Sequence, residues 1–307
     1  MIAPLHSAGE GGYWGREGAP SLEYSKQEVT MRFGGPVFET VSDPEAWVQA
    51  LRRLGYTAAY CPVGPEASDQ EVREYEWAAA GAGIVIAEVG AWSNLLSPDA
   101  ATRTQALEHC RRQLDLADRI GARCCVNIAG SRGPLWHGPH RDDLADDAFD
   151  LVVESVRSII DTVRPTRTYY ALETMQWMLP DSLASYERLL RAVDRTAFAV
   201  HFDPVNLVNS PERYYHNGPL IREFVSRLGP HIRSCHAKDV LLAERALVHL
   251  DEVRPGLGGL DYATYLRELS RLEPETPLML EHLQTAEEYA LAAKHIRGIG
   301  KQVGVEM

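Results

Sequence analysis

Residues 197–209 read AFAVHFDPVNLVN, an apolar run that ends abruptly at Asp203. A run of apolar and β-branched residues followed by an acid and a proline is typical of a buried parallel strand with a carboxylate at its carboxyl end. Three other stretches share this design: YYALET with Glu173, IRSCHAKD with His236, and PLMLEHL with Glu281. The four polar residues are 30, 33 and 45 residues apart, and each interval is about the length of one strand–helix–strand unit.

The same alternation of short apolar runs with amphipathic helical patterns extends from residue 30 to the end of the chain. It predicts strands at 31–34, 57–63, 84–89, 122–128, 168–173, 197–203, 231–236 and 278–282. It predicts helices after Pro44, at 70–80, around 107–114, and at 143–163, 182–193, 219–228, 262–272 and 286–299. Eight such units in about 270 residues match the size and order of a (β/α)8 TIM barrel. A doubly wound open sheet is the alternative, but no GxGxxG follows the first strand.

The barrel is expected to be a single domain over residues 29–307, preceded by an N-terminal arm over residues 1–28. The arm contains five glycines among its first eighteen residues and has no periodic apolar face. The oligomeric state stays open, and the arm is a candidate contact with a neighbouring subunit of a homo-oligomer.

Composition excludes several classes of partner. Forty-three acidic against 31 basic residues give a formal net charge of -12, which repels nucleic acid and anionic lipid surfaces. No run of about 18 apolar residues occurs, so no membrane-spanning helix is expected. The five cysteines are odd in number and scattered, which favours reduced thiols in the cytoplasm.

The four strand ends are predicted to form a metal site. Barrel strands alternate side chains between the interior and the helix layer, so His201 would point inward with Asp203, and Ser234 with His236. Three converging carboxylates repel one another unless they are protonated or bind a cation. Three carboxylates and an imidazole suit one divalent ion such as Mn²⁺, Mg²⁺, Co²⁺ or Zn²⁺. Taken singly, each has a structural alternative, such as a turn acid, a core histidine or an ion-pair partner of Lys238.

Five motifs resemble those of the xylose-isomerase-like barrel superfamily of sugar isomerases and epimerases. They are ALET at 171–174, HFDPVN at 201–206, CHAKD at 235–239, RPGLGGLD at 254–261 and LEHL at 280–283. The resemblance covers residue 30 to the end, and it implies that Glu173, Asp203, His236 and Glu281 bind one divalent metal. It also implies that Glu173 and Glu281 remove and return a substrate proton.

The resemblance implies a metal-dependent isomerase or epimerase that acts on a sugar, sugar acid or inositol-derived ketone through an enediolate. Two positions depart from ketose 3-epimerases: Asn206 stands where they carry a histidine, and Leu242 where they carry an arginine. HAKD is closer to the inosose-dehydratase branch, so a metal-dependent dehydratase is the alternative. An apurinic endonuclease of the endonuclease IV type is the runner-up, but it needs more histidines on the strand ends and a basic DNA-binding face.

Further side chains at predicted strand ends and loops are candidate contacts with a small carbohydrate substrate. Lys238 is a candidate oxyanion partner, and its alternative is a rim lysine paired with Asp239. Trp177, like Trp92 and Trp136, offers a face for a sugar ring or a packed pocket wall. The complete set of candidate contacts is Asn206, Lys238, His201, Trp177, Glu88, Asn127 and His137.

Overall fold

The computed structural model describes residues 29–307 of the chain, so the expected arm over residues 1–28 lies outside the described residues. Eight strands form the barrel: β2 (Arg32–Gly34), β3 (Ala58–Tyr60), β4 (Val85–Gly90), β5 (Cys124–Asn127), β6 (Tyr170–Glu173), β7 (Phe198–Phe202), β8 (Ile232–Ala237) and β11 (Pro277–Leu280). They pair in parallel and close in the order β11-β2-β3-β4-β5-β6-β7-β8. The predicted (β/α)8 barrel is therefore confirmed.

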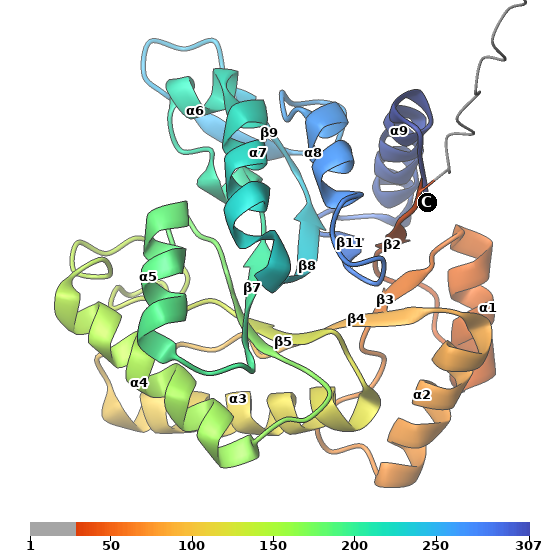
Figure 1. Ribbon diagram of the computed structural model, residues 1–307, viewed down its shortest axis with the longest axis horizontal. Helices are drawn as coiled ribbons and strands as arrows, with labels where there is room; N and C mark the ends of the chain where they lie inside the picture. Colours follow the sequence, from red (N-terminus) through yellow and green to blue (C-terminus); the bar gives the residue numbers. More distant parts are fainter. Residues whose placement is uncertain (1–28) are drawn as a thin grey trace, which may run out of the picture.

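Helices surround the strands on the outside of the barrel (Figure 1). They are α1 (Pro44–Leu54), α2 (Asp69–Ala82), α3 (Ala100–Ile120), α4 (Asp146–Val163), α5 (Leu183–Val193), α6 (Pro211–Tyr215), α7 (Asn217–Leu228), α8 (Tyr262–Leu269) and α9 (Ala286–Val303), with short 3-10 helices at Val205–Leu207 and Gly229–His231. Local sequence sets their ends. At α1, the Asp43 side chain accepts a hydrogen bond from the Ala46 amide, and the helix ends at Gly55 with φ 67°.

Two small sheets lie outside the barrel. The strand β1 (Val29–Thr30) pairs in parallel with β12 (Val305–Glu306), which brings the C-terminus beside the first described residues (Figure 1). An antiparallel hairpin of β9 (Asp239–Leu242) and β10 (Leu250–Val253) follows β8. The sequence did not predict this hairpin, because β10 is largely exposed and shows no buried apolar face.

The side chains of the strands alternate between two environments, as predicted. Along β6, Tyr170 and Leu172 belong to the large core between strands and helices. Ala171 between them belongs instead to a small cluster with Cys124, Val126 and Ala199. Since these residues point away from the helices, they fill the inside of the barrel with small side chains. His201, two residues after Ala199 on β7, points inward as well.

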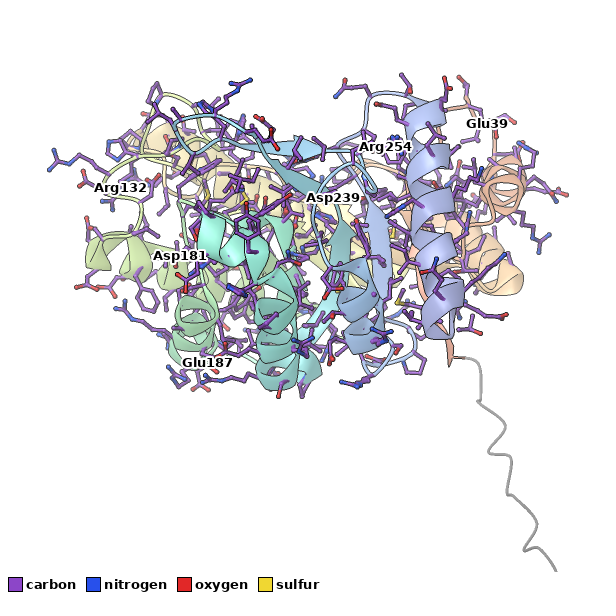
Figure 2. All side chains as sticks on the ribbon, turned by 90° about the horizontal axis from the view of Figure 1, so that it is seen from above. Glu39, Arg132, Asp181, Glu187, Asp239 and Arg254 are labelled. Carbon is purple, nitrogen blue, oxygen red and sulfur yellow. The ribbon has the colours of Figure 1, made fainter. Side chains whose placement is uncertain are left out.

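The loops that follow the barrel strands gather at one end of the molecule (Figure 2). In that view Arg132, Asp181 and Asp239, which follow β5, β6 and β8, lie nearer this end than Glu187 in the middle of α5. This is the end to which the strands deliver their carboxyl-terminal side chains, and in barrels of this kind it carries the active site.

All five cysteines are free, in agreement with the predicted reduced thiols. Among the described residues, no helix has the length and apolar character needed to cross a bilayer.

Gly34 is predicted to be indispensable for the pairing of β2 with β3. A Cβ at this position would lie 2.1 Å from the carbonyl oxygen of Ala58, a backbone atom of the neighbouring strand. We expect Gly34→Ala to lower the free energy of unfolding by at least about 1–3 kcal/mol, because β2 must shift away from β3. Urea denaturation measures the effect. Gly64→Ala is the matched control, since a Cβ there meets nothing within 4 Å. Equal stability of the two variants would contradict the prediction.

Candidate functional site

The four predicted ligands meet at the carboxyl end of the barrel. Glu173 ends β6, His236 lies on β8, and Asp203 and Glu281 directly follow β7 and β11. One donor atom from each lies within 4.8 Å of the others. The Nδ1 atom of His236 lies 2.8 Å from Glu281 Oε1 and 3.3 Å from Glu173 Oε1. Strand spacing in the sequence therefore identified side chains that the fold brings together.

A lysine ammonium lies in the middle of this cluster. Lys238 Nζ is 2.9 Å from Asp203 Oδ2 and 2.5 Å from Glu281 Oε1, and the lysine is almost fully buried. Asp239 has a different task, because its carboxylate accepts hydrogen bonds from the amides of Gly256 and Gly258. The alternative of a rim lysine paired with Asp239 is therefore wrong.

Burial and charge act against each other in the cluster. Burial raises the pKa of Asp203 to about 6, although Lys238 opposes the shift. Burial would also raise the pKa of Glu173, but Lys238 and His236 outweigh it and lower that pKa to about 2. Burial would lower the pKa of His236, but Glu281 and other neighbouring carboxylates raise it well above its ordinary value. The two neighbouring cations thus outweigh burial at Glu173 and Glu281, whereas burial outweighs them at Asp203.

The donor set fits a divalent metal ion. Asp203 Oδ2 and Glu281 Oε1 are buried, and neither accepts a hydrogen bond of good geometry, although the Lys238 ammonium lies close to both. Buried carboxylate oxygens of this kind are suited to a cation, and three carboxylates with one imidazole are ligands that Mn²⁺, Mg²⁺, Co²⁺ and Zn²⁺ accept. Glu173, Asp203, His236 and Glu281 are the residues that would hold it.

A second polar layer lies beneath the cluster. His236 Nε2 is 3.2 Å from Glu88 Oε2, and the other oxygen of Glu88 contacts His201 Nε2 at 2.9 Å and the hydroxyl of Ser234. A carboxylate that accepts the Nε2 proton of His236 turns Nδ1 toward the cluster, where it contacts Glu281 as a cation and would offer its lone pair once a metal ion replaced the Nδ1 proton. Burial would raise the pKa of Glu88, but His236 and His201 lower it below its usual range.

This layer changes the expected roles of three side chains. Glu88 and His201 were expected to contact substrate, but they are 1% and 0% exposed and lie below the cluster. Asn127, also fully buried, accepts a hydrogen bond from the Ser93 amide and donates one to the Ser93 carbonyl. It fixes the loop after β4 from within. None of the three lines the cavity above the cluster, so our proposal below does not include them as substrate contacts.

A cavity of about 520 Å³ opens above the cluster. Glu173 and Glu281 line it, whereas Asp203 and His236 do not. The other expected contacts gather there too: the cavity wall includes Asn206, Lys238, Trp177 and His137. The Asn206 amide donates to Glu173 Oε1 at 2.9 Å, and the Trp177 indole donates to the His137 carbonyl at 3.0 Å.

Several lining residues were missed from the sequence. Those that carry a polar group are Tyr60, Gln176, Glu252, His282 and Tyr289. Two of them could have been predicted from the motifs. Gln176 lies two residues after ALET, and His282 lies within LEHL. His282 has φ 61°, a strained conformation for a residue other than glycine, at the turn that follows Glu281. Glu252 had no signal, because it lies on the unpredicted hairpin.

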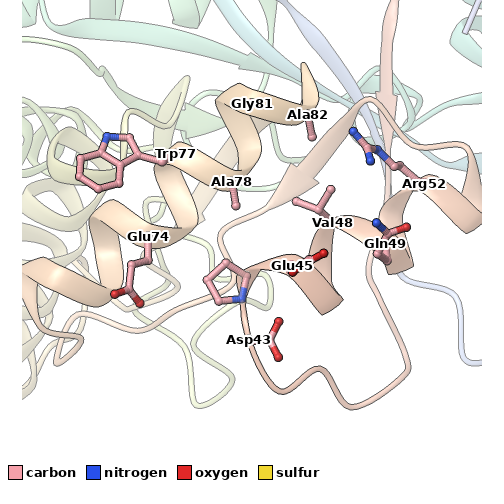
Figure 3. A pocket seen from close by; sticks show the side chains of 11 residues that line it. Asp43, Glu45, Val48, Gln49, Arg52, Glu74, Trp77, Ala78, Gly81 and Ala82 are labelled. Atoms are coloured by element: carbon pink, nitrogen blue, oxygen red, sulfur yellow. The ribbon is translucent and has the colours of Figure 1, made fainter.

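A second hollow, of about 590 Å³, lies between α1 and α2 (Figure 3). Asp43, Glu74 and Trp77 line it, and none of the four predicted metal ligands does. Its position on the helix layer, away from the strand ends, makes it a weaker candidate for a catalytic site.

The chain is an α/β barrel in which a buried Glu, Asp, His and Glu at the strand ends could together hold a metal ion. The family model described as xylose isomerase-like TIM barrel matches residues 48–299, and the chain belongs to this family. No curated protein matches the chain.

Three solved structures illustrate the relationship. D-psicose 3-epimerase from Clostridium cellulolyticum H10 is 17% identical with a TM-score of 0.65, over 90% of this chain and 100% of that one. A xylose isomerase-like TIM barrel protein from Mycobacterium smegmatis, in complex with magnesium, is 18% identical with a TM-score of 0.62, over 92% and 98%. The probable 3-DHS dehydratase of Bacillus anthracis is 17% identical with a TM-score of 0.64, over 87% and 97%. At these identities the likeness establishes the fold.

Lys238 is predicted to stabilise the metal-free protein. Lys238→Met leaves three buried carboxylates without their ammonium partner, and we expect a loss of about 3–5 kcal/mol in the free energy of unfolding in EDTA. Because a bound divalent ion supplies the missing positive charge, Mn²⁺ should restore more stability to this variant than to the wild type. Thermal unfolding with EDTA and with Mn²⁺ measures both effects. Lys294→Met, at an exposed position of α9, is the control. An Mn²⁺ response equal to that of the wild type would refute the prediction.

Glu88 is predicted to tune metal affinity through His236. Glu88→Gln keeps the size of the side chain but weakens the hydrogen bond that orients the imidazole, so we expect the Kd for Mn²⁺ to rise about 10–100-fold. Competition with a fluorescent chelator gives the affinity, and the visible spectrum of the Co²⁺-loaded protein reports the ligand field. Glu223→Gln, at an exposed position of α7, should leave both unchanged. Wild-type affinity and spectrum in Glu88→Gln would show that Glu88 does not orient His236.

Proposed function

We propose that this protein is a divalent-metal-dependent isomerase or epimerase acting on a sugar, sugar acid or inositol-derived ketone through an enediolate. One observation carries the proposal. Of the four clustered ligands, Glu173 and Glu281 face the cavity, whereas Asp203 and His236 are fully buried beneath it. Two carboxylates are therefore accessible to a substrate, and they come from strands three places apart around the barrel.

The chemistry follows from this arrangement. When bound, a divalent ion polarises a carbonyl and its neighbouring hydroxyl and so acidifies the carbon-bound proton between them. Glu173 and Glu281 have pKa values below the usual range, because Lys238 and His236 outweigh the effect of burial. Both are ionised at neutral pH, as a base must be. One removes the proton and becomes protonated. For isomerisation it returns that proton to the next carbon, and for epimerisation the other glutamate takes up a proton from water and delivers it to the opposite face of the same carbon.

Two neighbours support this proton transfer. The Asn206 amide, 2.9 Å from Glu173 Oε1, holds that carboxylate in position. The Lys238 ammonium, at the floor of the same cavity, stabilises negative charge that develops on a substrate oxygen. The epimerase and the magnesium complex among the solved relatives support the same class of reaction and of cofactor.

A dehydratase is the second candidate. Loss of water from the enediolate requires a proton donor for the departing β-hydroxyl, in addition to the base. Lys238 offers such a donor beside Glu281, at an Nζ–Oε1 distance of 2.5 Å. The probable dehydratase among the solved relatives supports this alternative. The cytoplasmic location, the absence of nucleic-acid partners and a homo-oligomeric state remain predictions.

Solvent exchange is predicted to reveal the reaction. Mn²⁺-loaded protein incubated in D₂O with ketoses, inososes and keto-sugars should introduce deuterium next to the carbonyl of at least one of them, and EDTA should stop the exchange. NMR and mass spectrometry detect it. Isomer formation supports an isomerase or epimerase, and water loss without isomer formation supports the dehydratase. Absence of both exchange and product with every compound would refute the proposed function.

The acid–base assignment has its own test. At saturating Mn²⁺, Glu281→Gln should lower turnover by about 10²–10⁴-fold, because the amide cannot accept the proton. Circular dichroism and the Mn²⁺ affinity check that the fold and the site persist. Turnover at the wild-type rate would mean that Glu281 is not the base.

A further inference from the structure

The two oxygens of the Glu281 carboxylate have different surroundings. Oε1 lies in the cluster, 2.8 Å from His236 Nδ1 and 2.5 Å from Lys238 Nζ. Oε2 lies 3.6 Å from Nε2 of His282, which is too far for a direct hydrogen bond. The first oxygen therefore belongs to the cluster, whereas the second remains available to a substrate.

The backbone of His282 adopts the left-handed conformation, with φ 61°. Two other described residues besides glycine have a positive φ, and both, Arg164 and Asp194, end helices, where this conformation is common. His282 instead lies next to Glu281 in the loop after β11, in the wall of the cavity. A glycine adopts this conformation without strain, and strained residues of other types cluster at functional sites. The conformation therefore points to a use for the imidazole itself.

Glu252 holds the imidazole of His282. The Nδ1 atom lies 3.1 and 3.2 Å from the two carboxylate oxygens of Glu252. Both residues line the cavity, and 56% of the His282 side chain and 38% of the Glu252 side chain are exposed. A contact between groups as exposed as these adds little to the stability of the fold. It does orient the ring, because a carboxylate that accepts the Nδ1 proton leaves Nε2 for another partner.

The hairpin of β9 and β10 brings Glu252 to this position. Asp239, its first residue, is buried, and the carboxylate accepts hydrogen bonds from three amides of the turn that follows β10. Asp239 and Arg254 mark the two ends of the hairpin, on the side of the molecule where the strand-end loops gather (Figure 2). Glu252 lines the cavity, whereas the neighbouring Asp251, which is also exposed, does not. A hairpin fixed at its base thus directs one of two adjacent acids at the cavity.

His282 Nε2 and Glu281 Oε2 can bind one atom together. Two atoms 3.6 Å apart can both lie about 2.8 Å from a third atom between them, which is hydrogen-bond distance. A hydroxyl group suits this position, because it donates one hydrogen bond and accepts others. Toward a hydroxyl, Nε2 serves as donor or as acceptor, so the ring makes this contact in either protonation state.

We infer that His282 binds a substrate hydroxyl on the carbon next to the one whose proton Glu281 transfers, and that Glu252 is the positioning residue that holds the imidazole for it. The inference rests on the proposed function, in which the carbonyl and the hydroxyl of the reacting carbon face the metal ion. The nearest remaining polar group is then the hydroxyl one carbon further from the carbonyl. The substrate is therefore an α,β-dihydroxy ketone, whose β-hydroxyl His282 recognises.

Matched substrates test the contact. Full-length Mn²⁺-loaded protein is incubated in D₂O with D-fructose, D-tagatose and an inosose, and with the analogue of each that lacks the β-hydroxyl. We expect kcat/KM for exchange at the α carbon to be about 10-fold lower for the deoxy compound, because one hydrogen bond is lost. Exchange is measured rather than product, since the β-hydroxyl is the group that leaves in the dehydratase alternative.

Variants of the two residues locate the contact. In His282→Asn and His282→Gly, the parent and deoxy compounds should react within about 2-fold of each other, because the partner of the hydroxyl is absent. Asparagine and glycine both accept the left-handed backbone, and the Mn²⁺ affinity checks that Glu281 keeps its place. Glu252→Ala should remove part of the discrimination. Asp251→Ala, on the same strand, is the matched control and should keep all of it.

The outcomes distinguish the inference from the proposed function. Equal exchange of parent and deoxy compounds by the wild type would overturn the inference and leave the proposed function standing. The same holds if the full discrimination survives in both His282 variants, whether or not their rates fall. Full discrimination in Glu252→Ala would overturn the role of Glu252. Absence of exchange with every compound would overturn the proposed function, and with it the inference.

Discussion

The site depends on one electrostatic constraint, which is that three carboxylates at the end of the barrel are removed from water. Glu173 and Asp203 are almost wholly buried, and Glu281 exposes only 12% of its side chain. Such a group is stable only beside positive charge. The protein provides it through His236 and Lys238, whose Nζ lies among the carboxylate oxygens. A divalent ion would satisfy the same constraint, so the ammonium and the metal ion meet one requirement in two ways.

The layer beneath the cluster extends this constraint into the barrel. Glu88 is a fourth buried carboxylate, and it is satisfied by His201, Ser234 and His236. His236 therefore connects two acidic layers, with one ring nitrogen toward each. The imidazole cannot turn without leaving buried carboxylate oxygens unpaired in both layers. The orientation of His236 in the cluster is thus fixed by a buried polar network that lies below the cavity.

The sequence predicted the ligands well and the depth of other residues poorly, for one geometric reason. Alternation along a strand determines whether a side chain points inward, so Asp203 and His236 could be placed from the sequence alone. It does not determine how far along the barrel axis the side chain lies, because that depends on how neighbouring strands are staggered in the barrel. Glu88 and His201 point inward, yet Glu88 lies two residues before the end of β4 and His201 two residues before Asp203, and both fall below the cavity. Glu252 could not be predicted as a lining residue for another reason, because its exposed hairpin has no apolar pattern in the sequence.

The floor and the walls of the cavity are formed by different parts of the barrel. The floor comes from strand ends, where backbone geometry is fixed, and it holds the residues to which we assign proton transfer. The walls come from loops, which vary in length and composition without cost to the barrel. Leu242, where the resembling ketose 3-epimerases carry an arginine, lies on β9 and does not line the cavity. The departure at Leu242 therefore does not alter the cavity wall, which the tryptophans after β4, β5 and β6 help to form. Under the proposed function the same floor can serve different substrates, because the loops of the wall vary independently of Glu173 and Glu281.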